Sequence, residues 1–346
     1  MSDDKIILET HNYKWVDQAQ REIEKIKAKC DFAWIKGVEH FGSTAIFGIS
    51  AKPVLDIVIG VDDLKQAQEL VPILQAMNYV FWHDNPKKDR LFFVKNMPPY
   101  GEKRTHHIHV FETSHYEWYA RRLFRDYLNK HPDIATEYEN LKLNLATKYS
   151  DDRESYTEAK TDFIRNTMQE AIAPYISFEP LQIDHLPLLH RWLNNPHVAA
   201  WRGNDYADLQ KVKDKYSSYI DGYKIENSIQ KPIYSYVIKI WQQCVGYIQY
   251  YKADDFMRDG YSLKDIKNLS HNLAAIDFYI GEESFTGKGL GSVILNKFLP
   301  KFVDPYYDKT IVDPNLLNKS AICSYEKSGF KQHKILANLN VVIMIR

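Results

Sequence analysis

The chain has 346 residues, 45% of them hydrophobic, and 45 basic and 45 acidic side chains give it a formal charge of zero. This balance creates no global basic field, so we expect neither nucleic acid nor a membrane as a partner. Three cysteines, Cys30, Cys244 and Cys323, lack metal-ligand spacing, which indicates reduced thiols, no disulfide and no metal. A charged N-terminus and apolar runs well short of the ~20 residues of a membrane span indicate a cytoplasmic protein.

The N-terminal half alternates helical and strand patterns. Residues 12–29 have apolar side chains at helical spacing, and residues 40–61 predict a turn, a short helix and a buried strand. Residues 115–173 predict charged helices that break at Pro132. From Ile176 the pattern changes to a strand and then a helix at residues 185–193. Because single cores seldom grow to this length, we predict two domains, 1–174 and 175–346.

A glycine-containing turn and a pair of histidines stand out in the first domain. Residues 38–61, VEHFGSTAIFGISAKPVLDIVIGV, place Gly42-Ser43 before a strand that carries Asp56. With the tract His106 to Val110 and the helical stretch 124–160, this segment resembles the GrpB family, a group related to nucleotidyltransferases. The resemblance covers residues 5–171 and implies a nucleotidyltransferase-like α/β domain.

In working nucleotidyltransferases, Gly-Ser binds phosphate and two carboxylates spaced i, i+2 hold metal. Here the second position, two residues after Asp56, is Val58 and carries no carboxylate, so nucleotidyl transfer is the least favoured activity. The two histidines project from one strand face, which suits phosphate contacts, one metal, or a structural pair. The candidate nucleotide or anion site is Gly42, Ser43, Asp56, His107 and His109.

The C-terminal half contains a strand followed by a glycine turn. Residues 234–240 and 244–251 predict strands joined by a short turn, and residues 274–280 predict the next strand. The stretch AIDFYIGEESFTGKGLGSVIL, residues 275–295, puts this strand before three alternating glycines and an amphipathic helix. That arrangement directs backbone N–H groups at a phosphate and predicts a pyrophosphate site. An Asx-rich turn, Asp313 to Asn318, and a helix ending in YEKSGF follow.

These motifs together resemble the GNAT acetyltransferases, and most of all the aminoglycoside 6′-N-acetyltransferases. The similarity extends over residues 176–346 and includes His190 to Leu193, Trp201-Arg202-Gly203 and Val245 to Gln249. It implies a mixed, mostly antiparallel sheet, so the expected fold class is α/β (α+β) with two domains. It also implies acetyl-CoA as the cofactor and a small-molecule amine as the substrate, an aminoglycoside in first place, with antibiotic resistance as the outcome.

The resemblance assigns two catalytic side chains. Asp277 matches the acid that binds the amine and takes its proton, and Tyr325 matches the tyrosine that protonates the departing thiolate. A solvated strand-edge carboxylate and a core tyrosine are the alternatives. The cofactor contacts come from the strand backbone, the glycine turn and an asparagine that can also cap the next helix: Phe278, Tyr279, Ile280, Thr286, Gly287, Lys288, Gly289, Leu290, Gly291, Ser292, Asn318 and Tyr325.

A polycationic aminoglycoside requires an acidic groove. We expect Asp277, Asp313 and Glu282 to form it, and Trp201 to supply an apolar wall or to lie in the core. Phe278 departs from the family pattern, in which Gln often follows the catalytic Asp, and Thr286 replaces a Gln or Arg. Other acceptors therefore stay open: another polyamine, a siderophore precursor or a protein N-terminus. The alternative that is not an enzyme is a nucleotide-binding scaffold protein, whose C-terminal half binds CoA without transferring an acetyl group.

Overall fold

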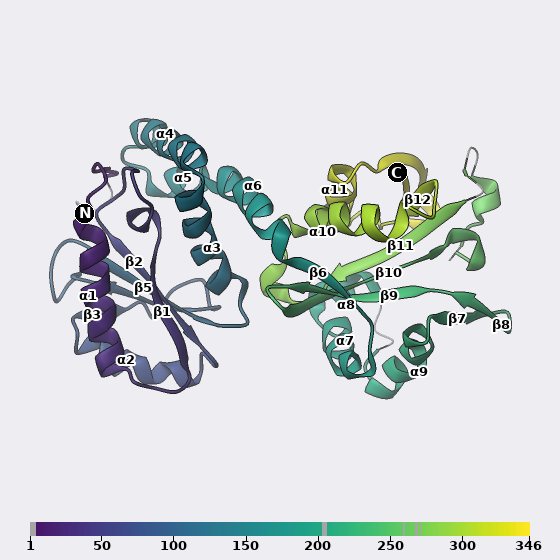
Figure 1. The fold of residues 1–346 in the computed structure, drawn as a ribbon, viewed down its shortest axis with the longest axis horizontal. Coiled ribbons are helices and arrows are strands. Elements are labelled where there is room, and N and C mark those ends of the chain that lie inside the picture. The colour runs from purple at the N-terminus through teal and green to yellow at the C-terminus, as the bar shows by residue number, and fades with distance from the viewer. Residues whose placement is uncertain (1–4, 203–205, 259, 267–268, 271) are drawn as a thin grey trace. The chain divides into compact units, whose positions relative to one another are not determined.

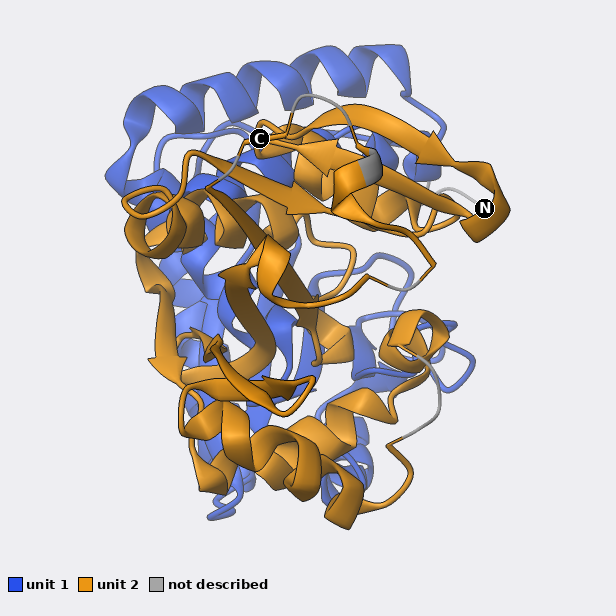
Figure 2. Ribbon diagram, turned by 90° about the vertical axis from the view of Figure 1, so that its right-hand side faces the viewer, with its two compact units in different colours: residues 1–171 blue, residues 172–346 orange. Residues whose placement is uncertain are grey.

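The computed structural model describes residues 5–202, 206–258, 260–266, 269–270 and 272–346. The chain divides into two compact units, Met1–Ala171 and Ile172–Arg346 (Figures 1 and 2). The boundary expected near residue 174 falls in the 3-10 turn Ala173–Tyr175, just past this division. None of the helices in these ranges is long and apolar enough to span a membrane.

A five-stranded sheet forms the centre of the N-terminal unit, in the order β1-β2-β5-β4-β3. The neighbouring strands β2 and β5 run parallel, and the other pairs are antiparallel. Inner parallel strands are buried on both faces, which explains the continuous apolar runs in this part of the sequence. The strands are β1 (Ile35–Phe41), β2 (Leu55–Val61), β3 (Tyr79–Phe81), β4 (Leu91–Lys95) and β5 (His106–Glu112).

The described part of the unit contains six α-helices, of which α1 and α3 contact β1 and β2, while α4 packs against α3 (Figure 1). The predicted helical region divides at Pro132, which occupies the first turn of α4, where its missing N–H costs nothing. Trp118 of α3 packs on the sheet, and a Cβ at Gly60 would lie 2.8 Å from its ring. The helices are α1 (Lys14–Lys29), α2 (Leu70–Gln75), α3 (Tyr116–Lys130), α4 (Pro132–Lys148), α5 (Arg153–Glu158) and α6 (Thr161–Ile172).

One buried lysine in this unit makes its stability depend on pH. Lys142 of α4 is only 2% exposed, and its ammonium donates to the Ser50 carbonyl oxygen. Burial, followed by the charge of Lys160, lowers the pKa of Lys142 from 10.5 to about 7, against the opposing effect of Glu139. The unfolded chain therefore binds more protons than the folded chain between those two pH values, and the free energy of unfolding rises with pH there.

We predict that Lys142→Met removes this rise. Urea unfolding at pH 7 and pH 9 should give wild type a larger gain in the free energy of unfolding than the variant. Lys148→Met is the matched control, because Lys148 is exposed on the same helix. An equal gain in all three proteins would contradict the assignment.

The C-terminal unit contains a seven-stranded sheet in the order β13-β14-β12-β11-β10-β9-β6. Every pairing is antiparallel except that of β11 with β12. The fold class expected from the sequence, two α/β domains with mixed sheets, is confirmed. The strands are β6 (Ile176–Pro180), β9 (Tyr234–Ile240), β10 (Gln243–Lys252), β11 (Leu273–Ile280), β12 (Lys309–Val312), β13 (Lys331–Leu336) and β14 (Val341–Ile345).

Helices cover both faces of this sheet, with α7 to α9 below it and α10 and α11 above it in Figure 1. A small hairpin, β7 (Tyr223–Glu226) and β8 (Ile229–Pro232), pairs only with itself among the described strands. The sequence did not predict this hairpin, because none of its strand residues is buried and both strands are only four residues long. The helices are α7 (Leu186–Leu193), α8 (Pro196–Arg202), α9 (Leu209–Ile220), α10 (Leu290–Phe298) and α11 (Lys319–Lys327).

The sheet opens between two neighbouring strands. β11 pairs with β10 along residues 274–280, but it pairs with β12 only over Leu273 to Ala275. Beyond Ala275 the second edge of β11 carries no strand in the described part of the chain. Unpaired backbone groups at such an edge can bind an extended chain as an added strand.

Candidate active site

Asp277 lies on β11 just past the point where the two strands separate. Arg202, the last residue of α8, binds its carboxylate through both terminal nitrogens, at 2.7 Å from Nη2 to Oδ1 and 3.1 Å from Nη1 to Oδ2. Gln249, its register partner on β10, donates from Nε2 to Oδ2 at 3.3 Å. The Asp277 side chain is 40% exposed, so an acceptor amine can reach it.

A buried tyrosine, Tyr247, helps to orient this acid through Gln249. The Tyr247 hydroxyl donates to Gln249 Oε1 at 2.6 Å, which turns the amide nitrogen of Gln249 toward Asp277. Tyr279 is 8% exposed, and its hydroxyl has no hydrogen-bond partner among the described residues. A buried polar atom of this kind usually meets a ligand or water.

Tyr325 of α11 lies near the same acid and is 6% exposed. Its ring packs edge-on against Phe278 at 5.8 Å and Phe330 at 5.3 Å between centroids. Burial raises the pKa of Tyr325, and the charge of Asp277 raises it further. The raised pKa keeps the proton on the phenol, so Tyr325 can hydrogen-bond the departing sulfur, and the core alternative accounts for the same burial. Phe278, the departure from the family pattern, forms an apolar contact here.

The glycine turn shapes the start of α10. Gly287 and Gly289 have left-handed φ angles of 69° and 76°, and a Cβ at Gly291 would lie 2.6 Å from Ser324 Oγ on α11. Thr286 and Ser292 bond within the turn, to the carbonyl oxygens of Glu283 and Gly289.

The N–H groups in the first turn of a helix lack intrahelical acceptors and attract anions, so this turn fits the pyrophosphate of CoA. Leu290 is 1% exposed and can contribute only its backbone. Asn318 accepts from the Ala321 N–H at 3.1 Å and thereby caps α11. The open edge of β11, residues 276–280, fits an extended pantetheine arm. Lys288 lies within the same turn.

Each acid expected to form the substrate groove has an arginine partner. Asp313 Oδ2 lies 3.4 Å from Arg258 Nη1 and accepts from the Tyr261 hydroxyl at 2.8 Å. Glu282 pairs with Arg191 and also accepts from the Trp192 indole N–H at 2.8 Å. The three acids that we expected to line the substrate groove, Asp277, Asp313 and Glu282, therefore each lie in a charge pair.

The apolar wall proposed for this groove is accessible. Trp201 is 47% exposed on α8, so it is not a core residue. Its neighbour Gly203, the third residue of the Trp201-Arg202-Gly203 motif, lies outside the described residues, as do four positions of the loop 254–272.

Three candidate residues of the N-terminal unit meet on the inner strands. Asp56 Oδ1 lies 3.0 Å from His107 Nδ1, and a ligand atom of His109 lies within 4.8 Å of both side chains. His107 donates from Nδ1 to the carboxylate, and its Nε2 is buried without a partner in the described ranges. Gly42 lies close by, because a Cβ there would be 2.5 Å from Asp56 Oδ2. Ser43 follows Gly42 at the start of a 3-10 turn.

His109 accepts a hydrogen bond at Nδ1, whereas His107 donates one from Nδ1. Arg90 Nη1 donates to His109 Nδ1 at 2.9 Å, so a neutral His109 carries its proton on Nε2. Burial lowers the pKa of His109, and the charges of Arg121 and Arg90 lower it further. His109 is also the register partner of Val58, the position where a second carboxylate was missing. The cluster thus offers one carboxylate, one free acceptor nitrogen and one N–H donor.

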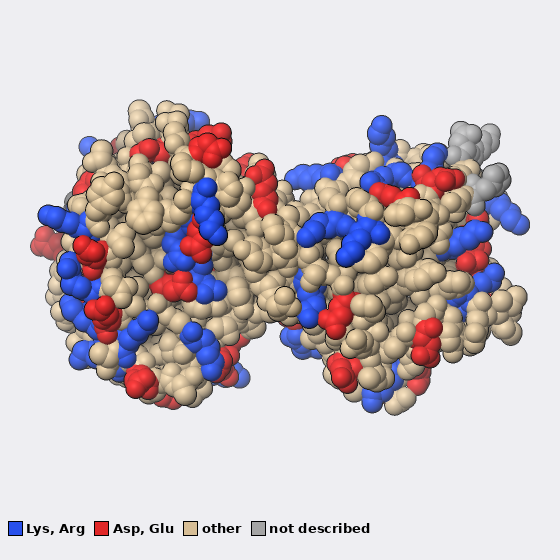
Figure 3. Space-filling model, viewed as in Figure 1, with Lys and Arg blue, Asp and Glu red and all other residues tan. Residues whose placement is uncertain are grey.

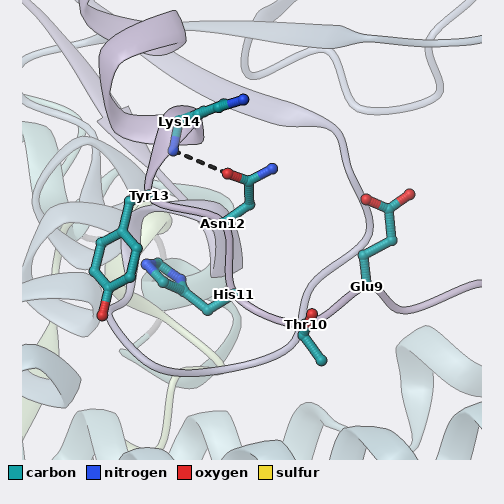
Figure 4. Close-up of a pocket in the computed structure, with 6 residues that line it drawn as sticks. All are labelled: Glu9, Thr10, His11, Asn12, Tyr13 and Lys14. Carbon is teal, nitrogen blue, oxygen red and sulfur yellow. Dashed lines mark hydrogen bonds between the residues drawn. The ribbon is translucent and has the colours of Figure 1, made fainter.

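A separate hollow lies just before α1, lined by Glu9 to Lys14 (Figure 4). His11 lies in this hollow, within aromatic contact of Tyr13 and Trp15, and both its ring nitrogens are buried without partners among the described residues. No side chain that the sequence nominated lines this hollow. On the face drawn in Figure 3, basic and acidic side chains are interspersed, as the zero formal charge predicted.

Comparisons with known proteins assign both halves. Residues 5–170 match the family model "GrpB protein", and residues 182–337 match the model "Acetyltransferase (GNAT) domain". A UPF0157 protein of Pseudomonas aeruginosa is 39% identical over 171 residues, which cover 49% of this chain and 69% of that protein. The aminoglycoside N(6′)-acetyltransferase type 1 of Klebsiella pneumoniae is 29% identical over 156 residues, 44% of this chain and 72% of that protein.

A solved structure of AAC(6′)-Ib in complex with paromomycin and acetyl-CoA covers 49% of this chain and 92% of its own, with 24% identity and a TM-score of 0.42. The family matches confirm both resemblances, and acetyl-CoA is the cofactor of the matched acetyltransferase domain. The chain therefore belongs to the GrpB family through its N-terminal domain and carries a GNAT acetyltransferase domain in its C-terminal half.

Proposed function

We propose that the C-terminal domain transfers an acetyl group from acetyl-CoA to a primary amine. The observation that carries this proposal is the accessible carboxylate of Asp277 beside the open edge of β11, directly before the glycine turn and α10. Bound acetyl-CoA supplies an activated thioester, so the protein has only to orient the amine and move two protons.

Two side chains move those protons. Asp277 binds the ammonium group of the acceptor and takes a proton from it, which frees the nitrogen lone pair for attack. Attack forms the N–C bond, and as the C–S bond breaks Tyr325 gives its phenol proton to the departing sulfur. The second proton of the nitrogen then passes to Tyr325 and restores the phenol. Backbone N–H groups along residues 278–280 polarise the thioester carbonyl. The buried rings around Tyr325 exclude water from this region.

Release of free CoA thiol from acetyl-CoA tests the proposal, with the purified full-length chain and a panel of primary amines. Amine-dependent release is the expected result. Binding of acetyl-CoA without release for any amine would refute the transferase and favour the scaffold reading.

The acceptor that the sequence resemblance implies is an aminoglycoside amine of the 6′-N type. The similarity to the Klebsiella pneumoniae enzyme supports this acceptor, and resistance would follow from acetylation of the drug. Kanamycin, tobramycin, gentamicin and neomycin form the first panel. Arg202 and Arg258, the partners of Asp277 and Asp313, repel a polycation. Thiol release with these drugs would support the aminoglycoside acceptor, and no release would contradict it.

Replacing Tyr325 with phenylalanine should lower kcat by about 10²-fold, because the departing thiolate loses its proton donor. The ring stays packed against Phe278, so acetyl-CoA affinity should not change. Single-turnover thiol release measures the effect. Phe330 is the neighbouring ring, and Phe330→Leu is a control for packing alone. Wild-type kcat in Tyr325→Phe would assign Tyr325 to the core.

The N-terminal domain has a second candidate role, as a binding site for a nucleotide or another anion. The N–H that a neutral His109 carries on Nε2, next to His107 in the described part of the domain, supports this role as a donor to an anion. Calorimetry with ATP and with inorganic phosphate tests it, and His109→Phe should abolish any binding. Undetectable binding to wild type would leave the cluster with a structural role.

A further inference from the structure

Two arginine–carboxylate pairs converge on the acceptor side of the active site. Arg202 pairs with Asp277, and Arg258 pairs with Asp313. Asp277 and Asp313 each lie two residues beyond the last register pair of β11 with β12, Ala275 and Ile311, so both pairs lie where these two strands separate. Two arginines balance two carboxylates there, so these four side chains add no net charge.

Arg258 has hydrogen-bonding capacity that the described protein does not use. Its side chain is 10% exposed, and only Nη1 faces Asp313. Its Nε and Nη2 are buried and have no hydrogen-bond partner among the described residues. A guanidinium presents its N–H groups in a planar fork that matches the two oxygens of a carboxylate or a phosphate. Two N–H groups of one buried guanidinium that lack an acceptor among the described residues therefore indicate an anionic ligand.

The ion pair between Arg202 and Asp277 also limits which acceptors can bind. An ammonium group that binds Asp277 competes with Arg202 for the same two oxygens. A purely cationic acceptor would leave the arginine uncompensated in a partly buried site, which is unfavourable. An acceptor that also carries an anionic group avoids this cost. Its ammonium group pairs with the carboxylate of Asp277, and its anionic group pairs with a guanidinium of the site.

We propose that the acceptor is a primary amine that also carries an anionic group, a carboxylate or a phosphate, bound by Arg258. This inference rests on the proposed acetyl transfer and narrows its substrate class. Arg258 is then a specificity-determining residue, and Asp313 holds its guanidinium in place through Nη1. An aminoglycoside, which carries no anion, is a poor acceptor under this proposal.

Matched acceptors test the proposal directly. Lysine and cadaverine differ by one carboxylate, and glucosamine 6-phosphate and glucosamine differ by one phosphate. We expect kcat/KM for at least one anionic member to exceed that of its partner by about 10- to 100-fold, the range of a charge-assisted hydrogen bond. Equal kcat/KM values within both pairs would overturn the proposal, as would a preference for the aminoglycoside panel.

Arg258 variants locate the source of the preference. Arg258→Met should bring the two members of the preferred pair close to parity, mainly by raising KM for the anionic one. Arg258→Lys, which keeps the charge but loses the fork, should restore part of the preference. Arg191→Met is the control, because Arg191 pairs with Glu282 and should leave the preference intact. A preference that survives in Arg258→Met refutes the role of this arginine.

The outcomes separate the two levels of the proposal. Thiol release with cationic amines but no anionic preference defeats only the substrate class. An absence of release with every amine, in a protein that binds acetyl-CoA, defeats the acetyl transfer and the substrate class together.

Discussion

Asp277→Asn should lower kcat by about 10²- to 10⁴-fold, the usual contribution of a general base. Asparagine keeps the shape of the side chain and one acceptor oxygen for Arg202, but it cannot take a proton from the ammonium group. Steady-state thiol release with the best acceptor measures the loss. Because the pyrophosphate and pantetheine contacts come from backbone groups, acetyl-CoA affinity should stay within about threefold of wild type.

Asp214→Asn is the matched control for this experiment. Asp214 is an exposed carboxylate on α9 that bonds Gln210, and we expect wild-type kcat from its variant. An Asp277→Asn enzyme with wild-type kcat would mean that the amine reaches the site already deprotonated.

Trp192→Ala should destabilise the C-terminal domain by about 3–5 kcal/mol, the usual cost of removing a buried aromatic ring. Trp192 is 0% exposed, and a Cβ at Gly281 would lie 2.1 Å from its indole, so the glycine backbone is packed directly on the ring. The variant also leaves Glu282 without the indole N–H. Urea unfolding followed by far-UV circular dichroism measures the change.

Trp201→Ala provides the comparison within the same pair of helices. Trp201 is 47% exposed, so its removal should change the free energy of unfolding by about 0.5 kcal/mol or less. Equal losses for the two tryptophan variants would contradict the packing described for α7.

The sequence predicted those parts of the site that lie close together along the chain. The strand with Asp277, the glycine turn and α10 follow one another without interruption, and local periodicity and turn chemistry are enough to identify them. The strands at residues 234–240 and 244–251 also occur as β9 and β10, joined by Trp241 and Gln242 with positive φ. Because their connection is so short, these two strands must pair as an antiparallel hairpin.

The charge partners could not be predicted in this way. Arg202 lies 75 positions from Asp277, and Arg258 lies 55 positions from Asp313. An arginine in a polar segment has the same pattern whether it is solvated or paired, so spacing carries no signal. His107 meets Asp56 across 51 positions, because β2 and β5 are parallel and a parallel pair requires a long crossover. Sequence identified the individual residues of that cluster but not their contact.

The short connection between the two units has a consequence for the origin of the protein. α6 ends at Ile172 and β6 begins at Ile176, and each unit has its own sheet and its own buried core. A single recombination event at this connection joins or separates whole folding units without cutting a strand or a helix. Once joined, the two domains are translated in equal numbers as one chain.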